Sequence, residues 1–387
     1  MPPIDAASLP DLPAPFWFIQ FFKVLGFTLH AVPMNLWYAG AILAVAAYAF
    51  GGGEARRWGS RLMLQMPIIV AAGINFGIVP LLFLQVAYAK AFYPATILMA
   101  WFWIAVIGLL IGAYAGVYVY AAGARGEGEA MTPVRRAAGW CSAVFFLAIG
   151  FLFANALSLT TNVRAWGDLL ERHSRGGAAT GTALNVADPT LWPRWLLMFG
   201  FALITTAAWT AVDAAWLAVG EDETYKRWAQ KFALRVAIAG AVWSTVAGAW
   251  YVFGTWSAEV RSEMFSIPDV HTGKSSFPLV FLTLLTGASP WVAPALLWLG
   301  RGKTLTRAAA AAVGGAQVGV LAVNGISRQF VQNFELRRLF QPGVSHQPVS
   351  TDWGPMVMFL AVFVAGVGVL VWLFAQLAKA GPADQTA

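Results

Sequence analysis

Charged residues are scarce in this chain. Only 11% of its 387 residues are Asp, Glu, Lys or Arg, whereas 59% are hydrophobic. A soluble domain carries about 25% charged residues, because it must cover its surface in water. Most of the surface of this protein must therefore face lipid. A nucleic-acid partner is excluded as well, since the net charge of +7 comes from short basic clusters without interleaved aromatic residues.

Cysteine is nearly absent. The one cysteine, Cys141, lies inside an apolar run. A single cysteine excludes an intrachain disulfide, a CxxCH haem attachment and an iron–sulfur cluster held by this chain alone. Residues 1–15 contain two aspartates and no Lys or Arg, so we expect no cleaved signal peptide there.

Long apolar runs, in contrast, fill the sequence. Crossing roughly 30 Å of hydrocarbon takes about 20 helical residues. Runs of that length occupy residues 16–50, 64–89, 97–122, 137–160, 194–218, 232–254, 277–299, 308–327 and 355–378. The sequence predicts an all-α integral membrane protein with about nine transmembrane helices. They form a single polytopic domain over residues 1–380, followed by a short flexible tail at 381–387.

The loops between the runs alternate in charge. Four of them carry three basic residues each: 51–62, 123–136, 220–231 and 300–307. The positive-inside rule makes these loops cytoplasmic, so the N-terminus lies outside and the C-terminus inside. The three longest loops are then outside: 161–193, 255–276 and 328–354. We expect a multi-pass protein of the bacterial cytoplasmic (inner) membrane, in contact with membrane lipid.

Acidic residues are almost missing from the apolar runs. Of the 18 acidic residues, only Asp213 lies clearly within a run, near its inner end. We expect it to pair with Arg235 or Lys231 at the inner interface. A proton-pumping or ion-coupled transporter usually needs several buried carboxylates, so the sequence disfavours that class.

One histidine, His30, lies inside a run, about 21 Å along a helix from Phe16 and so near mid-membrane. A neutral imidazole in lipid needs a partner. Haem iron, a carbonyl of a neighbouring helix and Asn75 are all open. Met34, one turn later, is a further candidate ligand, although methionine at that spacing usually packs. Arg328, at the outer end of the eighth run, suits a haem propionate or a lipid headgroup.

Several stretches resemble subunit I of the cytochrome bd-type quinol oxidases. FKVLGFTLHAVPMNLWYAG (residues 22–40) is similar to the family's first helix and places His30 on a haem-ligating histidine. GINFGIVPLLFLQVAYAKAF (residues 73–92) resembles its second helix. Residues 327–330 partly match the GRQPW motif that ends its eighth helix. The resemblance follows span order over most of the chain, and it implies the same nine-helix bundle, N-out and C-in.

Most of the family's catalytic residues are missing. The resemblance places the fifth-helix haem histidine on Leu197 and the eighth-helix glutamate on Val318. The third-helix glutamates linked to proton delivery fall on about Met99 and Ile107. The resemblance therefore implies no oxygen reduction by this chain alone. It implies at most one or two b-type haems, with His30 as the ligand of one.

Two functions remain open. One is a membrane subunit of a respiratory complex that relays electrons between the quinone pool and a periplasmic c-type cytochrome. The other is a haem-free scaffold that anchors partner subunits. Both predict docking at the outer face, where loop 328–354 carries four apolar residues among charges: Phe334, Leu336, Leu339 and Phe340. Alternatively, the outer loops fold onto one another as a cap. Small-solute transport is less favoured, because the sequence shows no inverted repeat.

Overall fold

The computed structural model describes residues 4–125, 131–266, 279–302 and 304–379. The expected tail at 381–387 and the second half of the outer loop 255–276 lie outside these residues. The first long helix is α1 (Phe16–Asn35), which continues through a π-helical segment, Leu36–Gly40, into α2 (Ala41–Phe50).

The described helices confirm the predicted all-α membrane fold. Eight helical stretches are long and apolar enough to cross a membrane, and α14 follows as the ninth long helix, apolar over Trp353–Val369. After α1 and α2, the long helices are α3 (Gly53–Ala87), α5 (Ala100–Ala124), α6 (Pro133–Thr161), α8 (Leu191–Val212), α9 (Glu223–Ala249), α11 (Leu279–Ala288) with α12 (Val292–Leu299), α13 (Arg307–Leu336) and α14 (Trp353–Lys379).

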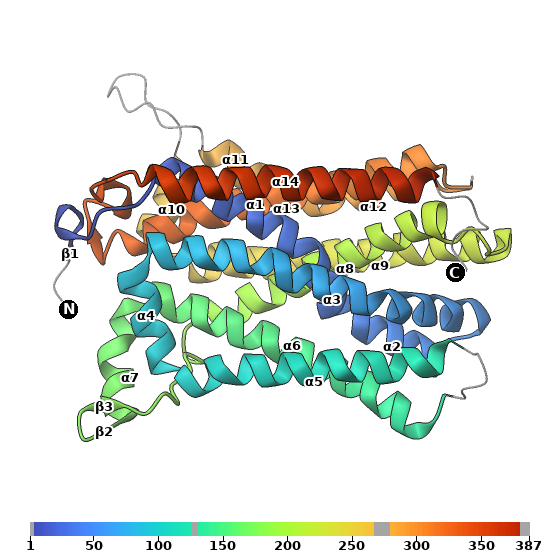
Figure 1. Cartoon of the computed structure of the whole chain (residues 1–387), viewed down its shortest axis with the longest axis horizontal. Helices are drawn as coiled ribbons and strands as arrows, with labels where there is room; N and C mark the ends of the chain where they lie inside the picture. Colours follow the sequence, from blue (N-terminus) through green and yellow to red (C-terminus); the bar gives the residue numbers. More distant parts are fainter. Residues whose placement is uncertain (1–3, 126–130, 267–278, 303, 380–387) are drawn as a thin grey trace.

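The long helices lie side by side along one axis (Figure 1). The helix ends that flank the four basic connections all lie at one end, which we call the inner end (Figure 1). The N-terminus lies at the opposite, outer end (Figure 1). Three short helices are also there: α4 (Ala89–Leu98), α7 (Trp166–Arg172) and α10 (Ala258–Met264). The arrangement matches the predicted alternation of loops.

Small residues allow the central helices to approach closely. A Cβ at Gly200 of α8 would lie 2.4 Å from the Ser244 Oγ of α9, and a Cβ at Gly240 of α9 would lie 2.9 Å from the Gly200 carbonyl. Without a hydrophobic force between helices in lipid, such close backbone contact is a main source of association. The α8–α9 pair therefore depends on both glycines.

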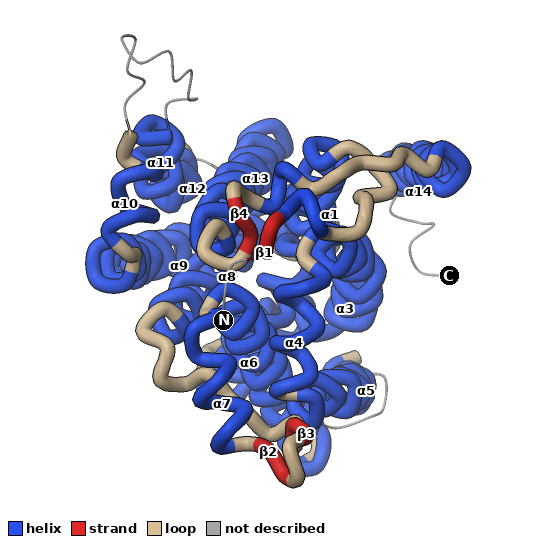
Figure 2. The backbone as a smooth tube through the Cα atoms, turned by 90° about the vertical axis from the view of Figure 1, so that its left-hand side faces the viewer, coloured by secondary structure: helices blue, strands red, loops and turns tan. Residues whose placement is uncertain are grey.

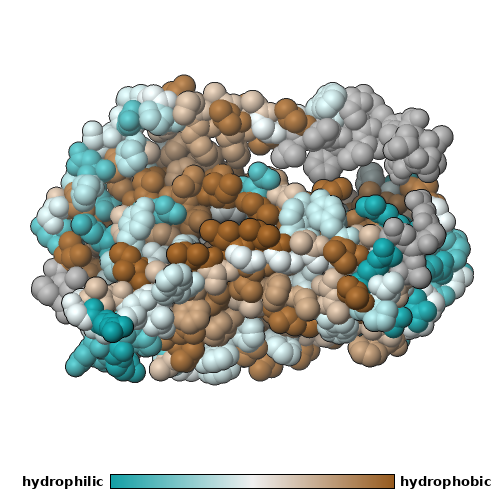
Figure 3. Space-filling model, turned by 60° about the horizontal axis from the view of Figure 1, so that its bottom comes forward, coloured by the Kyte–Doolittle hydropathy of each residue, from teal (hydrophilic) through white to brown (hydrophobic). Residues whose placement is uncertain are grey.

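The apolar surface lies in the middle of the molecule. On the face drawn in Figure 3, hydrophobic residues occupy the centre and hydrophilic residues gather toward the two ends. On α5, Trp101, Ile104, Ile107 and Ile111 are all exposed. Spaced at helical intervals, these side chains form the lipid-facing side of that helix. Seen along the bundle, α14 stands at its edge (Figure 2).

The outer end is closed by a cap in which the N-terminal segment pairs with the segment between α13 and α14. Strand β1 (Ile4–Asp5) pairs in parallel with β4 (Phe340–Gln341), and Leu12 forms a bridge with Val349. A two-stranded hairpin, β2 (Ser174–Arg175) and β3 (Ala178–Ala179), extends the same end.

The prediction that the apolar residues of loop 328–354 form a docking surface is wrong. The four apolar residues of loop 328–354 are buried, with exposures between 0% and 7%: Phe334, Leu336, Leu339 and Phe340. Buried side chains cannot attract a partner. The alternative, that the outer loops fold onto one another, is the one that the structure supports.

Candidate functional site

His30 lies on α1 and contacts α3. Its Nδ1 hydrogen-bonds the Gly73 carbonyl at 2.8 Å. A carbonyl only accepts, so Nδ1 carries the proton and Nε2 keeps a lone pair, the form in which histidine ligates metals. Of the three expected partners, the neighbouring carbonyl is confirmed. Asn75 is not the partner, since its amide donates to the Ala71 carbonyl within α3.

Two glycines allow this contact. A Cβ at Gly77 would lie 2.9 Å from both Nδ1 and Cε1 of His30, and a Cβ at Gly73 would lie 2.2 Å from the Trp37 ring. The α3 backbone can approach α1 only because both positions lack a side chain. The GINFG stretch at residues 73–77 is thus the part of α3 that receives His30 and Trp37.

Inward of His30, aromatic side chains fill the interior. The Trp37 ring centre lies 5.9 Å from that of His30 and 5.7 Å from that of Phe146, with which it stacks. Tyr38 meets Phe199 edge to face at 5.6 Å. Trp37 and Tyr38 are 6% and 1% exposed, so this region is closely packed.

Arg328 lies on α13 and faces Phe27, which is about one turn before His30 on α1. Its guanidinium lies over the Phe27 ring, 4.6 Å from the ring centre, and its charge acts on His30. The side chain is exposed. No described residue accepts a hydrogen bond from it. The structure therefore brings Arg328 and His30 to the same α1–α13 face.

Met34 does not join this pair. It packs against the central apolar core. Among the described residues, no three His, Cys, Asp or Glu side chains cluster as a metal site. His30 and Arg328 are the candidates that remain.

Lys23 is a candidate that the sequence reasoning missed. It is 9% exposed, its Nζ donates to Gln332 Oε1 at 2.7 Å, and the same atom lies 4.4 Å from the Tyr88 ring centre. The signal was a lysine inside the first apolar run, seven residues before His30. Such a residue is a functional candidate in a membrane.

Asp213 has different partners from those expected. Its carboxylate accepts from Arg61 Nη2 at 3.0 Å and from Arg61 Nε at 3.1 Å, and Gln65 Nε2 donates to it as well. The expected pairing with Arg235 or Lys231 is wrong, because Asp213 faces α3 across the bundle. This bidentate contact joins the π-helical segment Asp213–Leu217, which continues α8, to α3 at the inner end.

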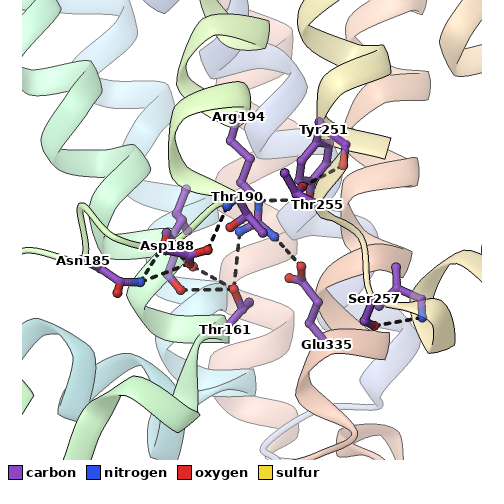
Figure 4. A network of polar contacts seen from close by, with 12 residues as sticks. Thr161, Asn185, Asp188, Thr190, Arg194, Tyr251, Thr255, Ser257 and Glu335 are labelled. Carbon is purple, nitrogen blue, oxygen red and sulfur yellow. Dashed lines mark hydrogen bonds and ion pairs between the residues drawn. The ribbon is translucent and has the colours of Figure 1, made fainter. Parts of the chain in front are cut away.

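A second polar cluster joins helices at the outer end (Figure 4). Arg194 of α8 forms an ion pair with Glu335 of α13, donates to Tyr251 Oη at 2.9 Å and reaches Thr161 of α6. Close by, Asp188 accepts hydrogen bonds from Ser158 and Asn185. The charges of Arg194 and Glu335 balance each other. We call this group the Arg194 clamp, because it joins α8 to α6 and α13.

These features define a helical membrane bundle with one histidine and two cations on a shared face. No sequence family matches this chain, and no curated protein is similar to it in sequence. Its fold is nonetheless similar to that of the bd oxidase from Geobacillus thermodenitrificans. The TM-score is 0.67 at 11% identity, over 96% of this chain and 100% of that one. The distant resemblance seen in the sequence is confirmed at the level of the fold.

Proposed function

We propose that this chain is the bd-like membrane subunit of an electron-transfer complex. It holds one b-type haem at His30 and relays electrons between the quinone pool and a periplasmic c-type cytochrome. The fold similarity supports the scaffold, and His30 carries the proposal. Bound haem supplies a centre that accepts and releases one electron at a time.

The chain's own residues supply the positioning. The Gly73 carbonyl fixes the proton on Nδ1 and orients the ring, so that Nε2 is free for iron. Gly77 keeps the space beside the ring. Arg328, exposed and without a described acceptor, is available to pair with a propionate.

One observation favours a second function, the haem-free scaffold. The interior next to His30 is filled by Trp37, Phe146 and Tyr38. Leu197 packs against the same core in the place where the resemblance would put a haem histidine. In this function the bundle anchors partner subunits without carrying electrons.

A pyridine haemochrome spectrum of the purified chain distinguishes the two functions. We expect a b-type spectrum from the wild type and loss of the Soret band in His30→Ala. The matched control is His346→Ala, because His346 is exposed in the outer loop and its replacement should leave the spectrum unchanged.

Two results would overturn the haem proposal: a wild-type protein without haem, or a His30→Ala spectrum equal to the wild type. Co-purification of haem-bearing partners with a colourless chain would then support the scaffold. Electron transfer itself is tested by adding reduced quinol and following reduction of a c-type cytochrome by the purified complex.

A further inference from the structure

One face of α1 carries four residues at helical spacing: Gln20, Lys23, Phe27 and His30. Intervals of three, four and three residues place them in a single row, because 3.6 residues make one turn. The row is about 15 Å long at 1.5 Å per residue. It starts near the outer end of the bundle and ends at His30.

A matching row of α13 faces it. Gly325 receives the Phe27 ring, since a Cβ at Gly325 would lie 3.2 Å from that ring. Arg328 lies over the same ring, and Gln332 accepts from Lys23. These three residues are also spaced by three and four, so the two helices meet along this shared strip.

Hydrogen-bond donors exceed acceptors on the strip. The Lys23 ammonium has three hydrogens, but only Gln332 accepts from it among the described residues. The buried Gln20 Nε2 has no described acceptor. Its Oε1 lies 3.2 Å from the Tyr88 hydroxyl, whose single hydrogen it shares with Asn333 Oδ1. Arg328 adds a guanidinium with no described acceptor, so an acceptor-rich group fits here.

Positive charge on the strip is also unbalanced. Lys23 and Arg328 repel each other, and no described carboxylate offsets either of them. The nearby Glu335 is already paired with Arg194. An ammonium out of water without a counter-charge is costly, and the cost falls when an anion binds.

We propose that Lys23, together with Arg328, binds the oxyanion of a membrane-borne ligand. Lys23 lies about 10 Å along α1 from Phe16, near the level where lipid headgroups meet the apolar core. Arg328 is exposed and gives access from the side. The oxyanion is a phospholipid phosphate or a haem propionate, which offer the same acceptor chemistry. The proposal rests on the contacts of Lys23 and does not require haem.

The first experiment measures lipid binding to the full chain after delipidation in detergent. We expect phosphatidylglycerol to raise the melting temperature more than phosphatidylcholine does, and to be retained in native mass spectra. Lys23→Gln should weaken phosphatidylglycerol binding about tenfold or more, the loss typical of one charge-assisted hydrogen bond. Lys23→Arg, which keeps the charge, should retain binding.

The matched control is Lys90→Gln. Lys90 is an exposed lysine of α4 at the same end of the molecule, so its removal changes the net charge equally without touching the strip. Equal losses in Lys23→Gln and Lys90→Gln would show that the lipid responds to overall charge, and would overturn the proposal.

A second arm separates the two sources of the oxyanion. If the ligand is a propionate, Lys23→Gln lowers the amount of bound haem and leaves lipid retention unchanged. A chain without haem would refute the haem function while leaving the lipid arm intact.

If the wild type binds both lipids equally and Lys23→Gln changes neither lipid binding nor haem content, the proposal is overturned and Lys23 is only a structural donor to Gln332. If Lys23→Gln does not fold, the wild-type lipid preference and Lys23→Arg decide alone.

Discussion

Two charged sets, one near each end of this bundle, differ in whether they contain a counter-charge. At the inner end, the Asp213 carboxylate lies between two nitrogens of Arg61 and the amide of Gln65. At the outer end, Lys23 has one neutral acceptor, Gln332, and a positive neighbour, Arg328. Asp213 and Lys23 themselves are both buried, at 4% and 9% exposure. Only the inner set contains its own counter-charge.

Whether a charged set contains its own counter-charge indicates whether it serves stability or ligand binding. A charge in lipid must be balanced, because desolvation is costly. Where the chain supplies both partners, as in Arg61 and Asp213, the pair joins helices and needs nothing else. Where it supplies only donors, the balance has to come from a ligand. The comparison therefore assigns the inner cluster to stability and the outer strip to recognition.

The largest effect is expected from breaking the inner pair. Asp213→Leu leaves Arg61 without its bidentate partner, and we expect a loss of about 3 kcal/mol in unfolding free energy, since removal of one partner of a buried pair costs roughly 3–5 kcal/mol. The lower value applies because Arg61 is 23% exposed and also lies 3.7 Å from Glu221. Denaturation of the wild type and of Asp213→Leu in detergent measures this loss in unfolding free energy.

The control for this variant is Glu54→Gln, a carboxylate of the same end that is 35% exposed and lies 3.8 Å from Arg57. It should change stability by less than about 0.5 kcal/mol. If the two variants were equally stable, the inner cluster would not be the helix joint that the comparison makes it.

The next effect concerns the α1–α3 contact between the two ends. Gly73→Ala places a methyl group 2.2 Å from the Trp37 ring. We expect a loss of about 2 kcal/mol, because overpacking a close contact costs roughly 1–3 kcal/mol. Gly108→Ala is the matched control, since nothing lies within 4 Å of that position. An unchanged melting temperature in Gly73→Ala would contradict the contact that orients His30.

A smaller effect should follow from loss of the outer carboxylate. Glu335→Gln removes the charge opposite Arg194, which keeps its contacts with Tyr251 and Thr161. We expect a loss of about 1.5 kcal/mol, the value of a hydrogen bond to a charged group. Glu259→Gln, whose exposed carboxylate pairs with Arg338, is the control. Lower stability of the control than of Glu335→Gln would contradict the charge balance of the Arg194 clamp.

Much of the fold could be predicted from the sequence. The apolar runs place the nine long helices, since membrane spans leave a strong signal in composition. The run at 64–89 nevertheless begins later than α3, which starts at Gly53. Its first turns carry Arg56, Arg57 and Arg61, and these charges hide a helix that extends beyond the apolar core.

The site was harder to predict, because side-chain partners come from helices far apart in sequence. His30 was found from its position in a run, but its contact with Gly73 depends on how α1 packs on α3. Proximity in the sequence favours Arg235 or Lys231 as the partner of Asp213, whereas its true partner, Arg61, lies 152 positions away. The apolar residues of loop 328–354 are covered by segments that the sequence does not place beside them. Leu339 and Phe340 pack in one buried cluster with the N-terminal segment, and Phe334 packs in another with α10.

The smallest effect is a pH dependence at the inner end. Asp222 caps α9, and its pKa lies below the ordinary 3.8 because the Tyr225 amide and then the Arg57 side chain donate to it. A depressed carboxyl pKa stabilises the fold above the unfolded value, 3.8, and this stabilisation is lost as the pH falls through the folded value. We expect Asp222→Asn to differ from the wild type at pH 6 and to converge with it at the lowest pH that the protein tolerates. Melting curves across this range, in one detergent and salt, measure the difference.

A difference in melting temperature that stays constant as the pH falls would mean that the carboxylate charge does not contribute. Because Asp222 is exposed, the difference should also shrink in high salt, whereas the loss in Asp213→Leu should not.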